Sequence, residues 1–244
     1  MIRAMETTLA PSPLVGRVAL VSGANRGIGL AVVRGIAERS ATTFLGARDL
    51  AAGEAAAAAL RADGLAVQAV QLDVTDRASI TAAVAAIAAA HGRLDVLVNN
   101  AGVLAYDNAI DFDPDTAERF WTINTLGPWL LAAAAAPLMR RNGWGRIVNV
   151  SSEMASLARM TASGPSYRVS KAALNAVTRV LAVELDGTGI LVNSVSPGWV
   201  RTEMGGPDAP RSIEQGCASI LWGVDLPDDG PSGGFFQDGA PLPW

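Results

Sequence analysis

Short apolar runs alternate with longer segments of helical periodicity along almost the whole chain. The run at residues 94–98 is nearly continuously apolar, as expected of a strand that is buried on both faces of a sheet. Six runs are clear, at residues 17–22, 42–47, 66–72, 94–98, 146–150 and 190–195, and residues 233–236 could supply a seventh. This alternation predicts an α/β fold, with a doubly wound parallel sheet of about seven strands and helices on both faces.

Two of the helices between these runs have clear start signals. Asp49 is a suitable N-cap for the alanine-rich helix that follows it. Asp113 precedes Pro114, which places an N-cap before a proline at the first helical position. This second helix is expected to run to about residue 141 and to kink at Pro128.

The composition bounds the organisation of the chain. At 244 residues, half of them hydrophobic and only 17% charged, the chain is long enough for one globular domain, which we assign to residues 14–244. Residues 1–13 contain a proline pair and predict a flexible tail. Residues 199–216 are rich in glycine, proline and polar groups and predict a flexible loop over the site.

Charge and cysteine content exclude several classes of function. The net charge is −4 with no basic run, which gives no support for nucleic acid or an anionic membrane as partner. No apolar run reaches membrane-spanning length, so we expect a soluble cytoplasmic protein. The lone cysteine, Cys217, and the lone histidine, His91, predict no disulfide and no metal site. His91 ends an alanine-rich helical segment, where it is expected to be a C-terminal helix residue.

A glycine-rich turn follows the first apolar run and precedes a helical pattern. Strand, glycine turn and helix together place backbone N–H groups and a positive dipole end beneath a phosphate. Glycines are needed because a Cβ would block the tight turn and the approach of a pyrophosphate. The turn reads Gly23-Ala24-Asn25-Arg26-Gly27-Ile28-Gly29.

The second apolar run ends at Ala47 and is followed by Arg48. In a dinucleotide site the end of this strand reaches the adenosine ribose, where an acid would accept from a free 2′-hydroxyl and an arginine suits a 2′-phosphate. Arg26 in the glycine turn could supply a second positive charge. The sequence therefore predicts NADP(H) as the cofactor.

Further polar groups follow the other strands. Asp73 could reach the adenine or cap the next helix, and the residues do not separate these roles. Asn99 and Asn100 either brace the sheet or hold cofactor, because adjacent amides are costly inside a protein unless hydrogen-bonded. Ligands of doubly wound sheets bind at the carboxyl ends of strands, so these groups should converge.

The segment with the strongest catalytic signal contains Tyr167 and Lys171. Lys171 is the only lysine among 19 basic residues, and it lies four positions after one of only two tyrosines. If the segment is helical, the two side chains share one face. A nearby cation stabilises a phenolate and lowers the pKa of the phenol toward the working range.

These motifs together resemble the short-chain dehydrogenases/reductases, along nearly the full length of the chain. The family adopts a single Rossmann-type domain. The matching residues are Ser22–Gly29, Asp73-Val74, Asn99-Asn100-Ala101-Gly102, Asn124, Ser152, Tyr167 with Lys171, and Pro197-Gly198 with Thr202. The C-terminal Gly-Phe-Phe-Gln-Asp-Gly and Pro-Leu-Pro-Trp are similar to carbonyl-reductase-type members.

The resemblance implies an NADP(H)-dependent oxidoreductase that reduces a ketone or aldehyde reversibly to an alcohol. Tyr167 would donate the proton, Lys171 would bind ribose hydroxyls and lower the pKa of Tyr167, Ser152 would hold the reacting oxygen, and Asn124 would hold a water. Val200 and Thr202 would contact the nicotinamide carboxamide. The implied cofactor contacts are Gly23, Asn25, Arg26, Gly27, Ile28, Gly29, Arg48, Asp73, Val74, Asn100, Ala101, Gly102, Tyr167, Lys171, Pro197, Gly198, Val200 and Thr202.

Three departures from the family pattern stand out. Ser22 replaces the usual threonine but keeps a hydroxyl. The segment before Tyr167 is slightly long, which leaves Ser151 and Ser163 as alternatives to Ser152. The region between Thr202 and residue 233 is short, so the lid is expected to be reduced and the pocket open.

Several questions stay open at the level of the sequence. The long insertion of the monomeric carbonyl reductases is absent before Tyr167, so a homodimer or homotetramer is expected. A cofactor-binding sensor of the same fold without turnover is the alternative function; loss of a catalytic residue would mark it, and none is missing. Tyr106, Trp199, Met204 and Trp222 could line the substrate pocket or simply pack.

Overall fold

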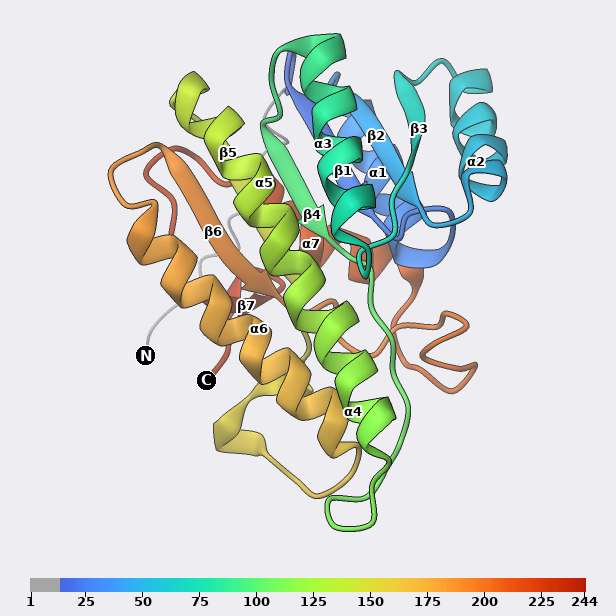
Figure 1. The fold of residues 1–244 in the computed structure, drawn as a ribbon, viewed down its shortest axis with the longest axis vertical. Helices are drawn as coiled ribbons and strands as arrows, with labels where there is room; N and C mark the ends of the chain where they lie inside the picture. Colours follow the sequence, from blue (N-terminus) through green and yellow to red (C-terminus); the bar gives the residue numbers. More distant parts are fainter. Residues whose placement is uncertain (1–13) are drawn as a thin grey trace, which may run out of the picture.

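Eight strands form a single sheet in residues 14–244, the part of the chain that the computed structural model describes (Figure 1). Their order is β3-β2-β1-β4-β5-β6-β7-β8. The strands are β1 Val18–Ser22, β2 Thr42–Ala47, β3 Val67–Gln71, β4 Val96–Asn99, β5 Gly145–Val150, β6 Ile190–Val195, β7 Phe235–Gln237 and β8 Ala240–Pro241. The predicted doubly wound sheet is confirmed. The tail predicted for residues 1–13 lies outside the described residues.

The last edge of the sheet differs from the prediction of about seven parallel strands. Neighbouring strands are parallel from β3 to β7, but β8 pairs antiparallel with β7. The turn between them is Asp238-Gly239, with φ of 52° and 77°. Two successive residues with positive φ suit the tight turn of a right-twisted hairpin, and Asp-Gly is a common sequence for it. The hairpin adds the eighth strand.

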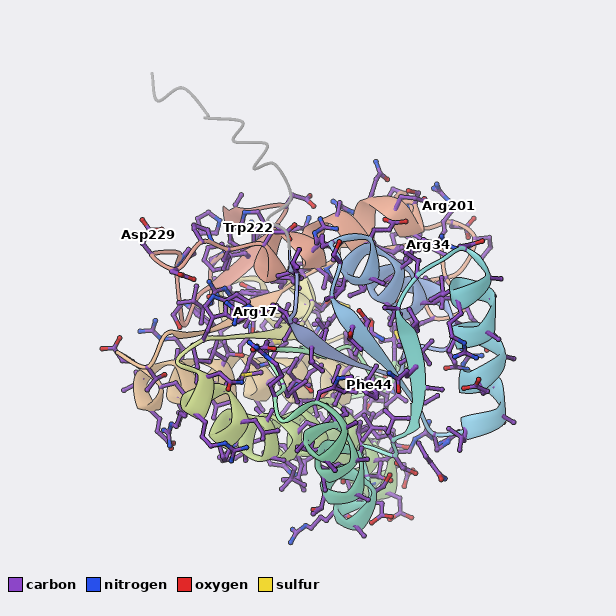
Figure 2. All side chains as sticks on the ribbon, turned by 90° about the horizontal axis from the view of Figure 1, so that it is seen from above. Arg17, Arg34, Phe44, Arg201, Trp222 and Asp229 are labelled. Carbon is purple, nitrogen blue, oxygen red and sulfur yellow. The ribbon has the colours of Figure 1, made fainter. Side chains whose placement is uncertain are left out.

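Seven α-helices in the described part cover the two faces of the sheet. They are α1 Gly27–Glu38, α2 Leu50–Ala62, α3 Arg77–His91, α4 Pro114–Trp121, α5 Gly127–Asn142, α6 Pro165–Glu184 and α7 Ile213–Val224. Figure 2 shows α1 and α7 on one side of the strands and α3, α5 and α6 on the other. Strand residues alternate between these layers: Val18 and Leu20 pack in the core with α3, α5 and α6, whereas Ala19 and Val21 pack with α1, α2 and α7.

Several predicted helix ends are confirmed. Asp49 accepts from Ala52 N at 3.1 Å and caps α2. Asp113 caps α4 through Asp115 N and Thr116 N. Helix α3 ends at His91.

The predicted helix from Pro114 to about residue 141 is interrupted, but not at Pro128. A π-helical turn, Thr122–Leu126, separates α4 from α5. Pro128 is the second residue of α5, directly after this turn, where it cannot donate a hydrogen bond to the preceding turn, and the kink expected there stays a prediction. Single π turns occur often at functional sites, and this one contains Asn124.

A chain of buried polar side chains braces β4, β5 and α6. Asn99 donates to Asn149 Oδ1 at 2.8 Å and to Pro128 O at 3.2 Å. Asn149 in turn donates to Thr178 Oγ1 at 2.8 Å. Of the two roles predicted for the Asn99-Asn100 pair, Asn99 therefore has the bracing one.

The strand order fixes where a ligand can bind. Because β1 lies between β2 and β4, the chain moves outward from β1 in opposite directions, and a crevice opens at the carboxyl ends of these strands. The glycine turn, Arg48, Asp73, Asn100, Ser152 and Pro197 each follow a strand at this edge.

Candidate active site

The turn between β1 and α1 is a cradle of bare backbone. Gly23 has φ +62°, and a Cβ on it would lie 2.8 Å from Ala101 Cα. A Cβ on Gly29 would lie 2.5 Å from Asn100 Nδ2 and 2.7 Å from Gly23 O. Gly27 has φ +57°. These positions admit only glycine without rearrangement, because side chains would clash or strain the turn. Asn25 and Ile28 are half-buried in the same turn.

Helix α1 begins without a side-chain cap. Arg26 occupies the N-cap position and its side chain bonds none of the first N–H groups. Helices α2, α3, α4 and α7 are instead capped by Asp49, Asp76, Asp113 and Ser212. The first turn of α1 also contains no acidic residue. The free N–H groups and the positive end of the helix dipole therefore favour an anion such as a pyrophosphate.

The Ser22 hydroxyl ties the glycine turn to the end of β4. Ser22 Oγ accepts from Asn100 N and Ala101 N, each at 3.1 Å. The Asn100 side chain donates back to Ser22 O at 3.0 Å and Gly23 O at 2.9 Å. Asn100 therefore shapes the cradle with its amide, and the serine does what the family's threonine hydroxyl can do.

Two exposed arginines flank the cradle. Ala24 N donates to Gly46 O at 3.0 Å, which joins the glycine turn to the end of β2, two residues before Arg48. Arg26 forms an ion pair with Glu203 at 2.6 Å. Arg48 is exposed and pairs with no carboxylate among residues 14–244. A positive charge therefore stands free at the end of β2.

Asp73 does not cap the following helix. Its Oδ1 accepts from Thr75 N at 2.9 Å and from Thr75 Oγ1 at 2.7 Å, while Asp76 caps α3. The capping alternative is thus wrong. Val74 is buried against Gly127, whose Cβ would lie 2.9 Å from Val74 Cβ.

Tyr167 and Lys171 are both buried on α6, one turn apart. Burial raises the pKa of Tyr167 to about 12, and the nearby Ser152 side chain acts in the opposite direction. Burial lowers the pKa of Lys171 to about 8. Lys171 Nζ donates to Val150 O at 2.7 Å. Loss of solvation dominates in the protein alone, and the lowering of the Tyr167 pKa by Lys171 stays a prediction.

Of the three candidate serines, Ser152 alone reaches the phenol. Its hydroxyl is close enough to the phenol to lower the pKa of Tyr167. Ser151 is buried and donates its hydroxyl to Asn175 Oδ1 at 2.8 Å. Ser163 is exposed on the loop before α6. The geometry therefore favours Ser152 over both alternatives.

The Asn124 amide holds three segments together. It accepts from Val103 N at 2.9 Å and donates to Val103 O and to Ser170 Oγ, each at 3.0 Å. Its Oδ1 still has a free lone pair. A Cβ on Gly102 would lie 3.2 Å from this oxygen and 3.5 Å from Lys171 Nζ. Both polar atoms therefore face the same space beside Gly102.

The segment after β6 approaches the glycine turn. Gly198 has φ +74° and its N–H donates to Ser196 Oγ, which redirects the chain. Thr202 lies close to the glycine turn, since its Cγ2 would be 3.7 Å from a Cβ on Gly27. Val200 is buried and packs against α7 at Gly216, so only its backbone is available to a cofactor.

Residues 199–216 have more regular structure than the predicted loop. Val200 and Arg211 form a parallel bridge, Trp199 Nε1 donates to Gly205 O, and the last residues, from Ile213, belong to α7. The flexibility of this segment stays a prediction.

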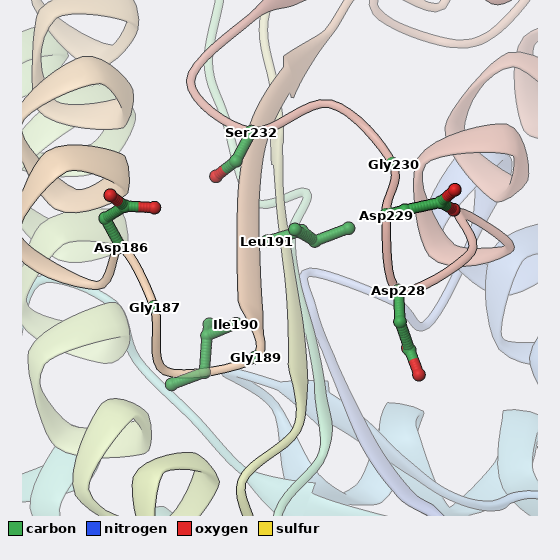
Figure 3. Close-up of a pocket in the computed structure, with 9 residues that line it drawn as sticks. All are labelled: Asp186, Gly187, Gly189, Ile190, Leu191, Asp228, Asp229, Gly230 and Ser232. Atoms are coloured by element: carbon green, nitrogen blue, oxygen red, sulfur yellow. The ribbon is translucent and has the colours of Figure 1, made fainter.

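A surface hollow of about 480 Å³ lies away from these residues (Figure 3). It is lined by residues 186–191 and 228–232, which surround the starts of β6 and β7. The hollow is therefore at the amino edge of the sheet, and none of the predicted site residues lines it.

Comparison with known proteins agrees with this geometry. The family model for short chain dehydrogenase matches residues 17–212. The chain belongs to the short-chain dehydrogenase family. Carbonyl reductase [NADPH] 1 of Sus scrofa is 35% identical over 275 residues, covering 93% of this chain and 94% of the relative. The predicted resemblance is thereby confirmed.

Two solved structures of short-chain dehydrogenases are similar throughout. Gluconate 5-dehydrogenase of Burkholderia cenocepacia J2315, in complex with NADP and tartrate, has a TM-score of 0.84 at 28% identity, covering 94% of this chain and 96% of the other. NADPH-bound carbonyl reductase from chicken fatty liver has the same TM-score and identity, covering 93% and 94%. Both proteins contain the phosphorylated cofactor that Arg48 led us to predict.

The residues of this short-chain dehydrogenase fit such a dinucleotide. The bare cradle and uncapped α1 suit a pyrophosphate, and the free Arg48 suits a phosphate on the ribose. Among residues 14–244, no helix is long and apolar enough to cross a membrane.

Sequence reasoning missed the residues that support the site from outside the motifs. Asp107 accepts from Ser166 N at 3.3 Å and bonds the Ser166 hydroxyl, joining the loop after β4 to the start of α6. Asn175 holds Ser151, and Ser170 holds Asn124. An acid or amide with a partner tens of residues away leaves no local pattern, so no sequence signal was available.

Replacing Ser22 tests the link between the glycine turn and β4. Ser22→Ala removes the acceptor of Ala101 N, whereas Asn100 N keeps Val98 O. We expect the free energy of unfolding to fall by about 1–3 kcal/mol, the cost of one unpaired buried group. Urea denaturation measures this. Ser22→Thr retains the hydroxyl and should match the wild type; equal stability of the alanine variant would contradict the role of this hydroxyl.

Proposed function

We propose that this short-chain dehydrogenase is an NADP(H)-dependent reductase of ketones or aldehydes that works reversibly on secondary alcohols. The observation that carries the proposal is the arrangement of three side chains. Tyr167 is buried, lies close to the Ser152 hydroxyl, and is followed one turn later by Lys171, at the edge of the sheet where the glycine cradle opens. An acid, an oxygen-binding hydroxyl and a cation are the groups that carbonyl reduction needs.

The cofactor would be held by the carboxyl edge of the sheet. The cradle and the first turn of α1 would bind the pyrophosphate, and Arg48 with Arg26 would bind the 2′-phosphate. Asp73 and Val74 would lie at the adenine, residues 100–102 and Lys171 at the nicotinamide ribose, and residues 197–202 at the nicotinamide. When bound, NADPH supplies the hydride for the substrate carbon.

The protein's part of the reaction is to place and protonate the carbonyl oxygen. Ser152 and Tyr167 donate to this oxygen, and the Tyr167 proton moves to it as the alkoxide forms. Because burial holds the pKa of Tyr167 at about 12, the phenol is protonated at neutral pH and is ready to act as the acid. Lys171, with a pKa of about 8, is mostly charged at neutral pH and stabilises the phenolate that results.

Asn124 and Lys171 would replace the lost proton. Asn124 Oδ1 and Lys171 Nζ face the same space beside Gly102, which would suit a water bonded to both. This gives Asn124 a positioning role in the proton supply, in addition to its bonds with Val103 and Ser170.

The main test is oxidation of NADPH, followed by absorbance, with a panel of ketones, aldehydes and diketones. Tyr167→Phe should lower kcat about 10²- to 10⁴-fold while NADPH still binds, because only the acid is removed. Ser152→Ala should also be slow, whereas Ser163→Ala, on the exposed loop, should match the wild type.

The outcomes separate the two functions considered. Turnover that is lost in Tyr167→Phe supports the reductase. Tight NADPH binding without turnover on any substrate would contradict it and favour a sensor of the same fold. Full activity of Tyr167→Phe would contradict the assignment of the acid.

A charge reversal at the end of β2 tests the cofactor. Arg48→Asp would place an acid where the 2′-phosphate is expected, so NADPH should bind more weakly and NADH better relative to it. We expect the ratio of the two dissociation constants to change by at least about 10-fold. Arg141→Asp, near the end of α5 at the opposite edge of the sheet, is the control. Equal losses for both cofactors would contradict the role of Arg48.

The outer faces of α5 and α6 would form the interface of a homodimer. Exposed apolar residues follow one side of α6 at Val169, Val180 and Val183, with exposed fractions of 62%, 58% and 72%. Ala172 and Ala176 lie between them, so the stripe extends about 20 Å. Helix α5 lies beside α6 (Figure 1) and presents Trp129, Ala133 and Pro137 on its exposed side.

A second copy of the chain is the occupant that this surface suits. A two-fold dimer would pair each apolar helix face with its own equivalent, and the small alanines would let the helices approach closely. The alignment with the Sus scrofa relative is longer than this chain, so that relative has segments that this chain lacks.

Val180→Arg should shift the protein toward monomer, since two arginines would be buried in the dimer without partners. Size-exclusion chromatography with light scattering measures the change. Ile110→Arg, at a 90% exposed apolar residue outside these helices, should leave the assembly intact. A wild type that is monomeric at micromolar concentration would contradict the interface.

A further inference from the structure

The loop between β4 and α4 carries an exposed aromatic residue to the active site. Tyr106 lies in this loop, and 71% of its surface is exposed. The loop leaves the sheet at Gly102, beside Asn124 and Lys171, and it returns at the N-cap of α4, Asp113. An exposed tyrosine is not needed by the core, so its position calls for another explanation.

Asp107 fixes this loop against the helix of the catalytic tyrosine. Its carboxylate accepts from Ser166 N and from the Ser166 hydroxyl. Gly164, the N-cap of α6, has no side chain to cap the helix. Asp107 therefore supplies a negative cap from 59 residues away, at the residue that precedes Tyr167.

This tether places the Tyr106 ring next to the general acid. A Cβ on Gly164 would lie 3.6 Å from Tyr106 Cδ1 and 3.7 Å from Met154 Cε. Tyr106 is also close enough to raise the pKa of Tyr167 electrostatically. The largely exposed ring and the Met154 thioether thus lie together beside Gly164, three residues before Tyr167.

The other candidates for the pocket have different roles. Trp222 packs on Phe236, with ring centroids 4.8 Å apart. Trp199 donates its indole N–H to Gly205 O within its own loop. Tyr106 is therefore the aromatic residue of the four candidates that the structure links directly to Tyr167.

We propose that Tyr106 determines substrate specificity, by forming a wall of the carbonyl site that favours substrates with an aromatic group beside the carbonyl. Met154 extends this wall, and Asp107 positions it through Ser166. An aromatic substrate would stack on or meet the edge of the Tyr106 ring while its carbonyl oxygen bonds Tyr167 and Ser152. The inference rests on the proposed reductase function.

The experiment compares two ketones that differ in aromaticity and little in size, acetophenone and cyclohexyl methyl ketone. Tyr106→Ala should lower kcat/KM for acetophenone about 3- to 10-fold and change that for cyclohexyl methyl ketone by less than about 2-fold. Tyr106→Phe keeps the ring and should keep the preference. The dissociation constant of NADPH should not change in either variant, because the ring lies beside Gly164 and not among the residues proposed to hold the cofactor.

The contact between Asp107 and Ser166 allows a second test that leaves the Tyr106 ring unchanged. Asp107→Ala should raise KM for acetophenone more than it lowers kcat, because it frees the wall without removing the acid. Ile110→Ala, in the same loop but 90% exposed, is the matched control and should behave as wild type.

The possible failures are distinguishable. If the wild type reduces both ketones and Tyr106→Ala changes them equally or not at all, the specificity role is wrong while the reductase function stands. Loss of activity in Tyr106→Phe would also overturn it, since the hydroxyl would then be the required group. If the wild type reduces no carbonyl in the panel, the proposed function fails and the inference fails with it.

Discussion

The buried ammonium of Lys171 is the constraint on which the site depends. A charge that leaves water costs several kcal/mol unless strong hydrogen bonds replace the solvent. Here one of them is visible: the carbonyl of Val150, the last residue of β5, accepts from Nζ at 2.7 Å. The bond fixes α6 to the end of β5, and Ser152 and Tyr167 are placed by those same two elements. A guanidinium could not replace this lysine, because a compact charge is required in this space.

The rest of the site follows from making that edge of the sheet rigid. Side-chain hydrogen bonds link each strand end to its neighbour: Ser22 links β1 to the turn after β4, and Asn99 links β4 to Asn149 in β5. Ser151 then links β5 to α6 through Asn175. Each of these hydrogen-bonding side chains occupies a buried position where an apolar side chain could otherwise pack. Most of these polar groups are paired with one another, which makes the buried edge rigid, but within residues 14–244 Asn99 Oδ1 and Asn175 Nδ2 are buried without a partner.

The sequence was sufficient wherever a local pattern determines structure. Continuous apolar runs predicted the strands, and Asp49 and Asp113 predicted helix starts, because a cap acts within one turn. The glycine spacing predicted the cradle because only bare backbone fits there. The prediction failed where residues far apart in the sequence meet: Asn124 in the π turn bonds Val103 and Ser170, and the cap of α6 comes from Asp107. The hairpin turn after β7 could have been predicted from the sequence, because Asp-Gly is a common pair in such turns.

The two shifted pKa values show what burial does to this pair of groups. Burial raises the pKa of Tyr167 to about 12 and so favours the protonated phenol, which is the form that the proposed reduction uses. Oxidation requires the same phenol to lose its proton first, and that step needs positive charge nearby. Lys171, with its pKa near 8, is the group that can provide it, but only while it remains protonated. Burial thus favours the neutral form of both groups, and the positive charge of Lys171 is what offsets the cost of forming a phenolate beside it.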